Sequence, residues 1–99
     1  MDNEQVIKIV RDYKQLISKQ IDNAQVYLFG SYSKGTAHTE SDIDVAVVVP
    51  AIKGDWLDIS TMLWLLAPQV NYRIEPVLID KRHPSPLYDD ILRTGVVIN

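Results

Sequence analysis

The chain has 99 residues and no cysteine, so disulfides, thiolate chemistry and cysteine-ligated zinc are excluded. Hydrophobic residues make up 46% of it, which is enough to build a core, and the length predicts a single domain spanning residues 1–99. The formal net charge is −3 with no basic run, which argues against direct binding of a nucleic-acid polymer. The polar N-terminus is unlike a signal peptide and no apolar run is long enough to span a membrane, so a cytoplasmic location is expected.

The first predicted elements are a helix and a short strand. Apolar residues recur at steps of three and four over residues 3–21, which predicts an amphipathic helix. Asp2 can cap this helix, and Gln5 completes a capping-box pattern. Residues 25–29 then form a strand that stops at Gly30.

The next segment runs from a tight turn into a buried strand. Residues 31–35 are expected to turn into one helical turn, and residues 36–41 read as a polar loop. The β-branched run over residues 43–49 predicts a strand that Pro50 ends. Its valines indicate a strand covered on both faces.

A second helix and a third strand follow. The helix is predicted over residues 55–67, with Pro68 as its end. The strand is predicted over residues 72–79, and Pro76 within it favours an edge position or a bulge because proline cannot donate to the ladder.

The chain is expected to end in a helix and a short strand. Residues 86–94 predict the helix with Gly95 as its C′ residue, and residues 96–98 can add the strand. The order α-β-turn-β-α-β-α predicts an α/β (α+β) fold, with helices on a small sheet. Few residues separate the first two strands, which favours an antiparallel or mixed sheet.

The turn after the first strand has the residues of a phosphate site. Gly30 lets a ligand approach the backbone, Ser31 adds a hydroxyl donor, and Lys34 can add a positive charge. The spacing is neither that of a P-loop nor that of a Rossmann fingerprint. Taken alone, Gly-Ser usually marks an ordinary strand-to-helix turn.

The next strand opens with two aspartates that suit a metal ion. Asp42 and Asp44 project from the same face, while Ile43 and Val45 point into the core. Two adjacent carboxylates repel each other unless a cation lies between them, and oxygen-only ligands suit Mg²⁺. The alternative is a solvated strand entry. Ser41, which precedes the pair, is a further candidate for nucleotide binding.

A third carboxylate could complete such a site. Glu75 lies within the third predicted strand and is the candidate for a metal ligand and a general base. The alternative is an exposed edge residue paired with Arg73, which points to the same face.

These segments resemble a known family. Phe29-Gly30-Ser31 followed after ten residues by Asp42-Ile43-Asp44-Val45 is similar to the motif of the DNA polymerase β nucleotidyltransferase superfamily. The finer pattern, Gly-Ser-Tyr-Ser-Lys-Gly and then Ser-Asp-Ile-Asp-Val, resembles the minimal nucleotidyltransferase branch of bacteria and archaea. The element order also fits, so the resemblance spans nearly the whole chain.

The resemblance implies a site and a partner. It implies that Gly30 and Ser31 hold the triphosphate of ATP, and that Asp42 and Asp44 bind Mg²⁺ together with a third-strand acidic residue. The family usually has aspartate at that position, where this chain has Glu75 followed by Pro76. The resemblance also implies a helical HEPN protein as partner, often a toxin that the nucleotidyltransferase neutralises by transferring AMP to a tyrosine.

Three functions follow from these observations. The first is Mg²⁺-dependent adenylyl transfer from ATP to a hydroxyl of a HEPN-type toxin. The second is a catalytically degenerate binding module that neutralises a helical partner by contact alone. The third is nucleotidyl transfer to a small molecule, although such enzymes carry an additional helical domain.

Overall fold

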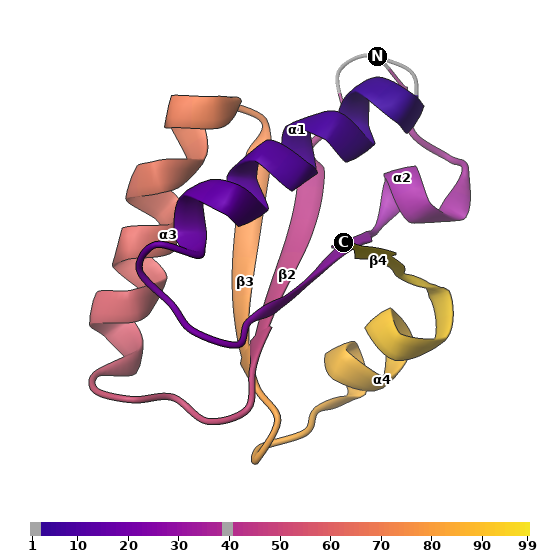
Figure 1. Ribbon diagram of the computed structural model, residues 1–99. Helices are drawn as coiled ribbons and strands as arrows, with labels where there is room; N and C mark the ends of the chain where they lie inside the picture. Colours follow the sequence, from indigo (N-terminus) through magenta and orange to yellow (C-terminus); the bar gives the residue numbers. More distant parts are fainter. Residues whose placement is uncertain (1–2, 39–40) are drawn as a thin grey trace.

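The computed structural model describes residues 3–38 and 41–99, in which helices and strands alternate along the chain (Figure 1). The predicted cap Asp2 lies outside the described residues. The elements and their bounds are α1 Asn3–Ile17, β1 Gln25–Phe29, α2 Ser31–Lys34, β2 Ile43–Val49, α3 Trp56–Val70, β3 Ile74–Asp80, α4 Pro86–Thr94 and β4 Val96–Ile98.

The strands form one mixed sheet in the order β3-β2-β1-β4. β1 pairs antiparallel with both β2 and β4, whereas β2 and β3 run parallel. The predicted mixed α/β architecture is therefore confirmed, as are the final strand over residues 96–98 and the edge position of Pro76 in β3.

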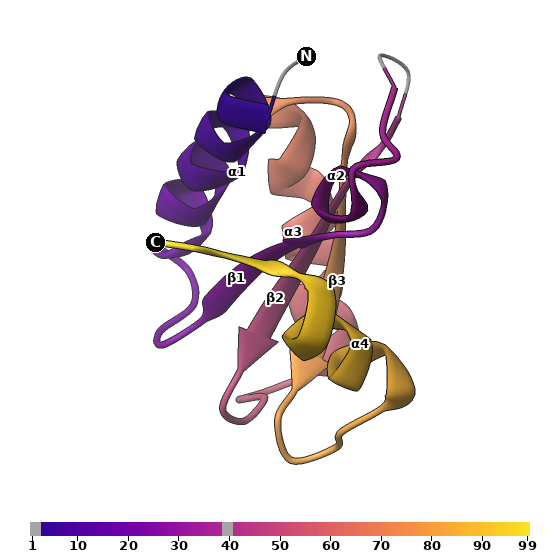
Figure 2. The ribbon, with the colours of Figure 1, turned by 90° about the vertical axis from the view of Figure 1, so that its right-hand side faces the viewer.

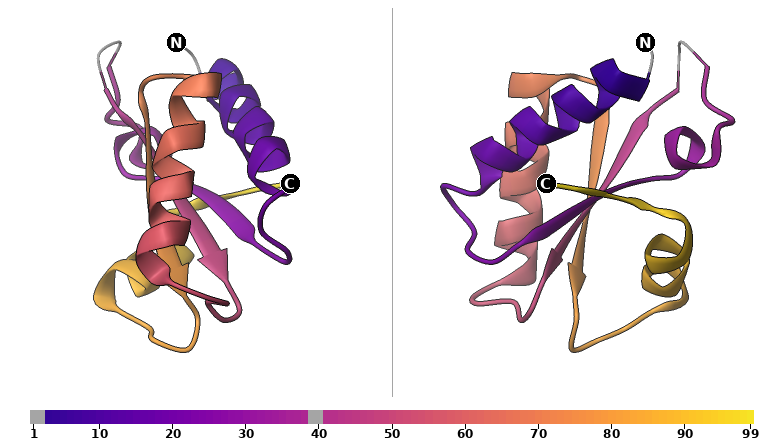
Figure 3. Two further views of the ribbon diagram at one scale, coloured as in Figure 1. Left: turned by 90° about the vertical axis from the view of Figure 1, so that its left-hand side faces the viewer. Right: turned by 45° about the vertical axis from the view of Figure 1, so that its right-hand side comes forward.

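The helices cover the two faces of the sheet unequally. α1 and α3 lie together on one face and α4 lies on the other, as the views in Figures 2 and 3 show. β2 supplies both cores: Val45 and Val47 pack toward α1 and α3, while Ala46 and Val48 pack toward Ile91 of α4. The prediction of a strand covered on both faces is confirmed.

The first helix ends earlier than expected. α1 stops at Ile17, whereas its apolar pattern predicted a helix to residue 21. The N–H of Gln20 donates to the Ile17 carbonyl at 2.9 Å, which tightens the chain into a turn. Ile21 still packs against the core, so its apolar character reflects burial beyond the helix rather than a longer helix.

The prediction that Pro68 ends the second helix is wrong. α3 continues to Val70, with Pro68 inside its last turn. Proline removes one intrahelical hydrogen bond, but the N–H of Asn71 still donates to the Ala67 carbonyl at 3.0 Å. The chain then turns at Asn71, so β3 begins at Ile74 rather than at residue 72.

Gly95 follows α4 as predicted, but in extended backbone with φ −75° rather than in a left-handed cap. A side chain at Gly95 would come within 2.6 Å of the Ile91 carbonyl oxygen, so close packing explains the glycine. Within the described residues, no helix is both long enough and apolar enough to cross a membrane.

Candidate active site

The turn after β1 and the first residues of β2 are in direct contact. Gly30 has φ 73° and ψ −143°, a combination open almost only to glycine. Phe29 is the register partner of Asp44, which brings the Gly30 backbone against the Asp44 side chain. A Cβ atom on Gly30 would overlap the Asp44 carboxylate oxygen and lie 3.1 Å from its Cγ. The predicted phosphate turn and the predicted metal ligand therefore belong to one site.

The turn itself is held by its own backbone. Ser31 is the first residue of α2, and the Lys34 N–H donates to the Gly30 carbonyl at 3.1 Å. Gly35 adopts a left-handed conformation with φ 73° and closes the turn through an N–H donated to the Ser31 carbonyl. These bonds fix Ser31 directly after Gly30, whose backbone lies against the Asp44 side chain.

Three carboxylates gather where β2 and β3 begin. Asp44 and Glu75 are register partners on neighbouring parallel strands, so their side chains leave the same face of the sheet. Asp42 precedes Asp44 by two residues and shares a hydrogen bond with Glu75. Asp42, Asp44 and Glu75 are therefore close enough for their charges to interact, on the sheet face that α4 covers farther along.

Mutual repulsion marks this group electrostatically. Burial raises the pKa of Asp44, and the charge of Asp42 raises it further. The pKa of Glu75 is also raised, first by burial and then by the charge and hydrogen bond of Asp42 and the charge of Asp44. Both causes, burial first and neighbouring negative charge second, disfavour the ionised form of these carboxyl groups. A bound cation would favour that form instead.

The carboxylates alone do not form a finished metal cage. Within residues 3–38 and 41–99, no three His, Cys, Asp or Glu side chains converge where a metal ion could bind. Mg²⁺ in nucleotide sites commonly takes one or two carboxylates and completes its shell with water and phosphate oxygens. The oxygen-only donor set fits an ion that arrives with a triphosphate.

Two further predicted ligands make protein contacts. The Lys34 Nζ lies 3.4 Å from an Asp90 carboxylate oxygen, and Asp90 also accepts from Arg93 at 2.8 Å. Ser41 closes a loop, because its Oγ accepts from the His38 N–H and its N–H donates to the His38 carbonyl, both at 2.9 Å. Asp90 was missed in the sequence because it lies 56 residues from Lys34, beyond any local pattern.

A buried carboxylate at the opposite end of β3, that of Asp80, also escaped prediction. Asp80 is buried and accepts from Arg82 Nη2 at 2.8 Å and from the Ile52 N–H at 3.3 Å. Hydrogen bonds from Arg82 and Ile52, with the guanidinium charge, hold the pKa of Asp80 well below its usual range despite its burial. An Asp-Lys-Arg sequence after a buried strand is the only local signal for this anchor.

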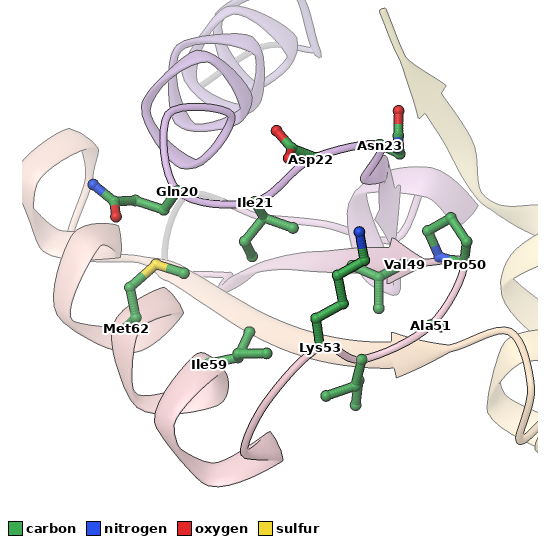
Figure 4. Close-up of a pocket in the computed structure, with 11 residues that line it drawn as sticks. Gln20, Ile21, Asp22, Asn23, Val49, Pro50, Ala51, Lys53, Ile59 and Met62 are labelled. Atoms are coloured by element: carbon green, nitrogen blue, oxygen red, sulfur yellow. The ribbon is translucent and has the colours of Figure 1, made fainter.

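A cavity of about 290 Å³ lies away from the carboxylates (Figure 4). It is lined by the segment after α1, by the loop after β2 and by Ile59 and Met62 of α3. Val49, at the far end of β2 from Asp44, forms part of its wall. This cavity is therefore separate from the carboxylate site.

Comparison with known proteins points to one chemistry. The nucleotidyltransferase domain family matches residues 4–92. The protein adenylyltransferase MntA of Shewanella oneidensis is 39% identical over 88 residues, covering 86% of this chain and 55% of that protein. The chain thus spans about half the length of this relative. A candidate protein adenylyltransferase of Methanocaldococcus jannaschii, MJ0141, is 27% identical over 99 residues and is covered to 99%.

Solved structures agree with the fold. A toxin–antitoxin complex with AMP-PNP superimposes with a TM-score of 0.61 at 30% identity, covering 100% of this chain and 73% of that chain. A tri-AMPylated HEPN toxin of Shewanella oneidensis in complex with its MNT antitoxin gives a TM-score of 0.52 at 27% identity, covering 98% and 68%.

Proposed function

Because the chain belongs to the nucleotidyltransferase domain family, we propose that it transfers AMP from ATP to a tyrosine hydroxyl of a HEPN-type toxin and so acts as an antitoxin. The contact between the Gly30 turn and the Asp44 carboxylate carries this proposal, since it joins a phosphate-binding turn to a metal-binding strand. The protein adenylyltransferase relatives and the AMPylated toxin complex support the acceptor and the nucleotide.

The residues of the site divide the work. The Gly30 backbone and the Ser31 hydroxyl hold the triphosphate, and Lys34 reaches it if the ion pair with Asp90 opens. Ser41 precedes Asp42 directly, and it would reach the nucleotide if its contacts with His38 open. The acceptor oxygen then bonds to the α-phosphorus in line, and pyrophosphate leaves.

Asp42 and Asp44 would hold Mg²⁺, with Glu75 as the third carboxylate. Bound Mg²⁺ neutralises phosphate charge and lowers the pKa of the attacking hydroxyl. Glu75 has a raised pKa and hydrogen-bonds a neighbouring carboxylate, so it is suited to take up the acceptor proton. ATP as substrate accords with the cytoplasmic location expected from the sequence.

The test is transfer of label from ATP. The chain, Mg²⁺ and α-labelled ATP are incubated with the helical HEPN-type protein proposed as its partner, and label on that protein is measured. We expect transfer by the natural chain and none by Asp44→Ala. Asp58→Ala is the matched control, because Asp58 is an exposed carboxylate on α3. Equal transfer by both variants would sink the proposal.

A second candidate is neutralisation of the toxin by contact alone. Two points favour it: Glu75 stands where the resemblance to the nucleotidyltransferase superfamily implies aspartate, and the described residues form no three-ligand metal group. A cell-protection assay distinguishes neutralisation by contact from neutralisation by AMP transfer. If the double variant Asp42→Ala/Asp44→Ala still protects cells from the helical protein, contact rather than transfer is the activity.

A further inference from the structure

One face of α3 is apolar and uncovered. Leu65 is 67% exposed and Tyr72, just after the helix, is 79% exposed. We call the exposed residues along this flank the α3 seam, which comprises Trp56, Leu57, Trp64, Leu65 and Tyr72. The outer faces of α1 and α4 carry charged pairs instead, such as Lys8 with Asp12.

The residues of α3 are almost all uncharged, as in a helix that other elements bury on both sides. Between Trp56 and Val70 its only charged residue is Asp58. A helix that is apolar around most of its circumference is normally buried. Figure 3 shows α3 at the margin of the molecule, with no other element on its outer side. Such a patch marks an interaction surface.

The neighbouring sheet edge argues against a strand as occupant. The Ile43 N–H donates to the Arg73 carbonyl at 2.8 Å, so odd-numbered residues of β3 turn their backbone groups toward β2. Pro76 therefore stands where a donor to an added strand would be needed. In contrast, Leu57 and Trp64 are seven residues apart, as are Leu65 and Tyr72, which is the repeat of helix-to-helix contacts.

The charges at the two ends of the α3 seam favour a second copy of α3 as its binding partner. Asp55 and Asp58 stand at its N-terminal end, and Arg73, stacked 5.6 Å from the Tyr72 ring centre, stands at the other. An antiparallel second copy of α3 places each acidic end opposite a basic end, and a two-fold axis satisfies both ends at once. The helix dipoles are also opposed in that arrangement.

We propose that the α3 seam is the interface of a two-fold dimer, with α3 of a second copy lying antiparallel across it. The α3 seam lies on the sheet face of α1 and α3, whereas Asp44 lies on the face of α4. Both sites therefore stay open in the dimer. The dimer does not depend on the transfer reaction, and a dimer without transfer, or the reverse, distinguishes the two proposals.

The test is the molar mass of the free chain in solution. Sedimentation equilibrium is run at concentrations of the natural chain up to about 100 µM, and we expect the dimer to predominate within that range. Leu65→Asp is expected to raise the dimer dissociation constant at least about 100-fold, because the symmetry buries the new charge twice. Leu92→Asp on α4 is the matched control, since Leu92 is 53% exposed, and it should leave the mass unchanged.

A charge exchange tests the orientation. Asp58→Lys and Arg73→Glu should each weaken the dimer, and the double variant should restore it, with circular dichroism checking that each variant folds. A natural chain that stays monomeric, or a dimer that Leu65→Asp leaves intact, overturns the proposal. So does a monomer that uses Leu65 only to bind the helical protein, since the α3 seam then belongs to that partner.

Discussion

The two ends of β3 carry carboxylates in opposite electrostatic settings. At one end, Asp80 is fixed by Arg82 and a backbone N–H, and its pKa is lowered. At the other, Asp44 and Glu75 crowd with Asp42, and their pKa values are raised. Within residues 3–38 and 41–99, none of the three forms an ion pair. The fold thus supplies a counter-charge for Asp80, whereas under the proposed function a bound cation would supply it for the three crowded carboxylates.

Removing the charge of Asp44, among the three crowded carboxylates, should have the largest effect on activity. Asp44→Asn is expected to lower adenylyl transfer at least about 1,000-fold, because metal charge stabilisation is worth several kcal/mol. The same change should raise the melting temperature without Mg²⁺, since it removes a repelling charge. Activity and thermal unfolding are measured on one preparation. A variant that melts lower would show that Asp44 is structural like Asp80.

Gly30→Ala should damage the same end by geometry. The change forces a strained backbone, at a cost of about 1–3 kcal/mol, and displaces the Asp44 carboxylate, so transfer should fall with the free energy of unfolding. Gly54→Ala is the control at the other end of the sheet, because Gly54 has φ 98° but open space around it. It should lose stability and keep transfer. Equal losses of transfer would remove the special role of the Gly30 contact.

Asp80→Asn should have the opposite effect to Asp44→Asn: it should lower stability and leave adenylyl transfer intact. Because the native pKa is lowered, the stabilisation is present at neutral pH and is lost as pH falls below the usual aspartate range. The difference in melting temperature between natural and variant protein should therefore be constant from about pH 7 to about pH 4 and should shrink steadily as the pH is lowered further. A difference that persists at the acid end would mean that Asp80 acts through packing alone.

Asp90→Asn should have the smallest effect. The Lys34–Asp90 pair is long and half exposed, so its loss should cost less than about 1 kcal/mol of stability. If Lys34 binds the triphosphate, freeing it should lower KM for ATP by about two- to fivefold. Lys34→Ala should raise KM instead. An unchanged KM in both variants would take Lys34 out of the site.

Local sequence patterns predicted those features of the fold that depend on neighbouring residues, such as the faces of a strand. The alternation along β2 correctly placed Asp44 opposite the core-facing Val45, and Pro76 correctly marked an edge strand. The end of α3 was mispredicted. The hydrogen bond that Pro68 cannot make in the final turn costs less free energy than the packing of that turn contributes.

Long-range partners escaped the sequence for a different reason. Nothing near Asp90 indicates that it meets Lys34, and nothing near Ile52 indicates that it donates to Asp80. Such contacts depend on how elements are arranged in space. Strand alternation alone predicted that Asp42 and Asp44 share a face, and Glu75 was the candidate third carboxylate because it lies within a predicted strand; the family resemblance implied the same acidic residue of the third strand.

The position of β2 has a consequence for motion. β2 is hydrogen-bonded on both sides and buried on both faces, so its amides should exchange with solvent only through near-global unfolding. Asp44 is anchored in that strand, whereas we expect the one-turn helix α2 beside it to open at lower free energy, because it is only four residues long. If the proposed transfer holds, we expect the carboxylates to stay fixed while the Gly30 turn moves to admit and release the nucleotide.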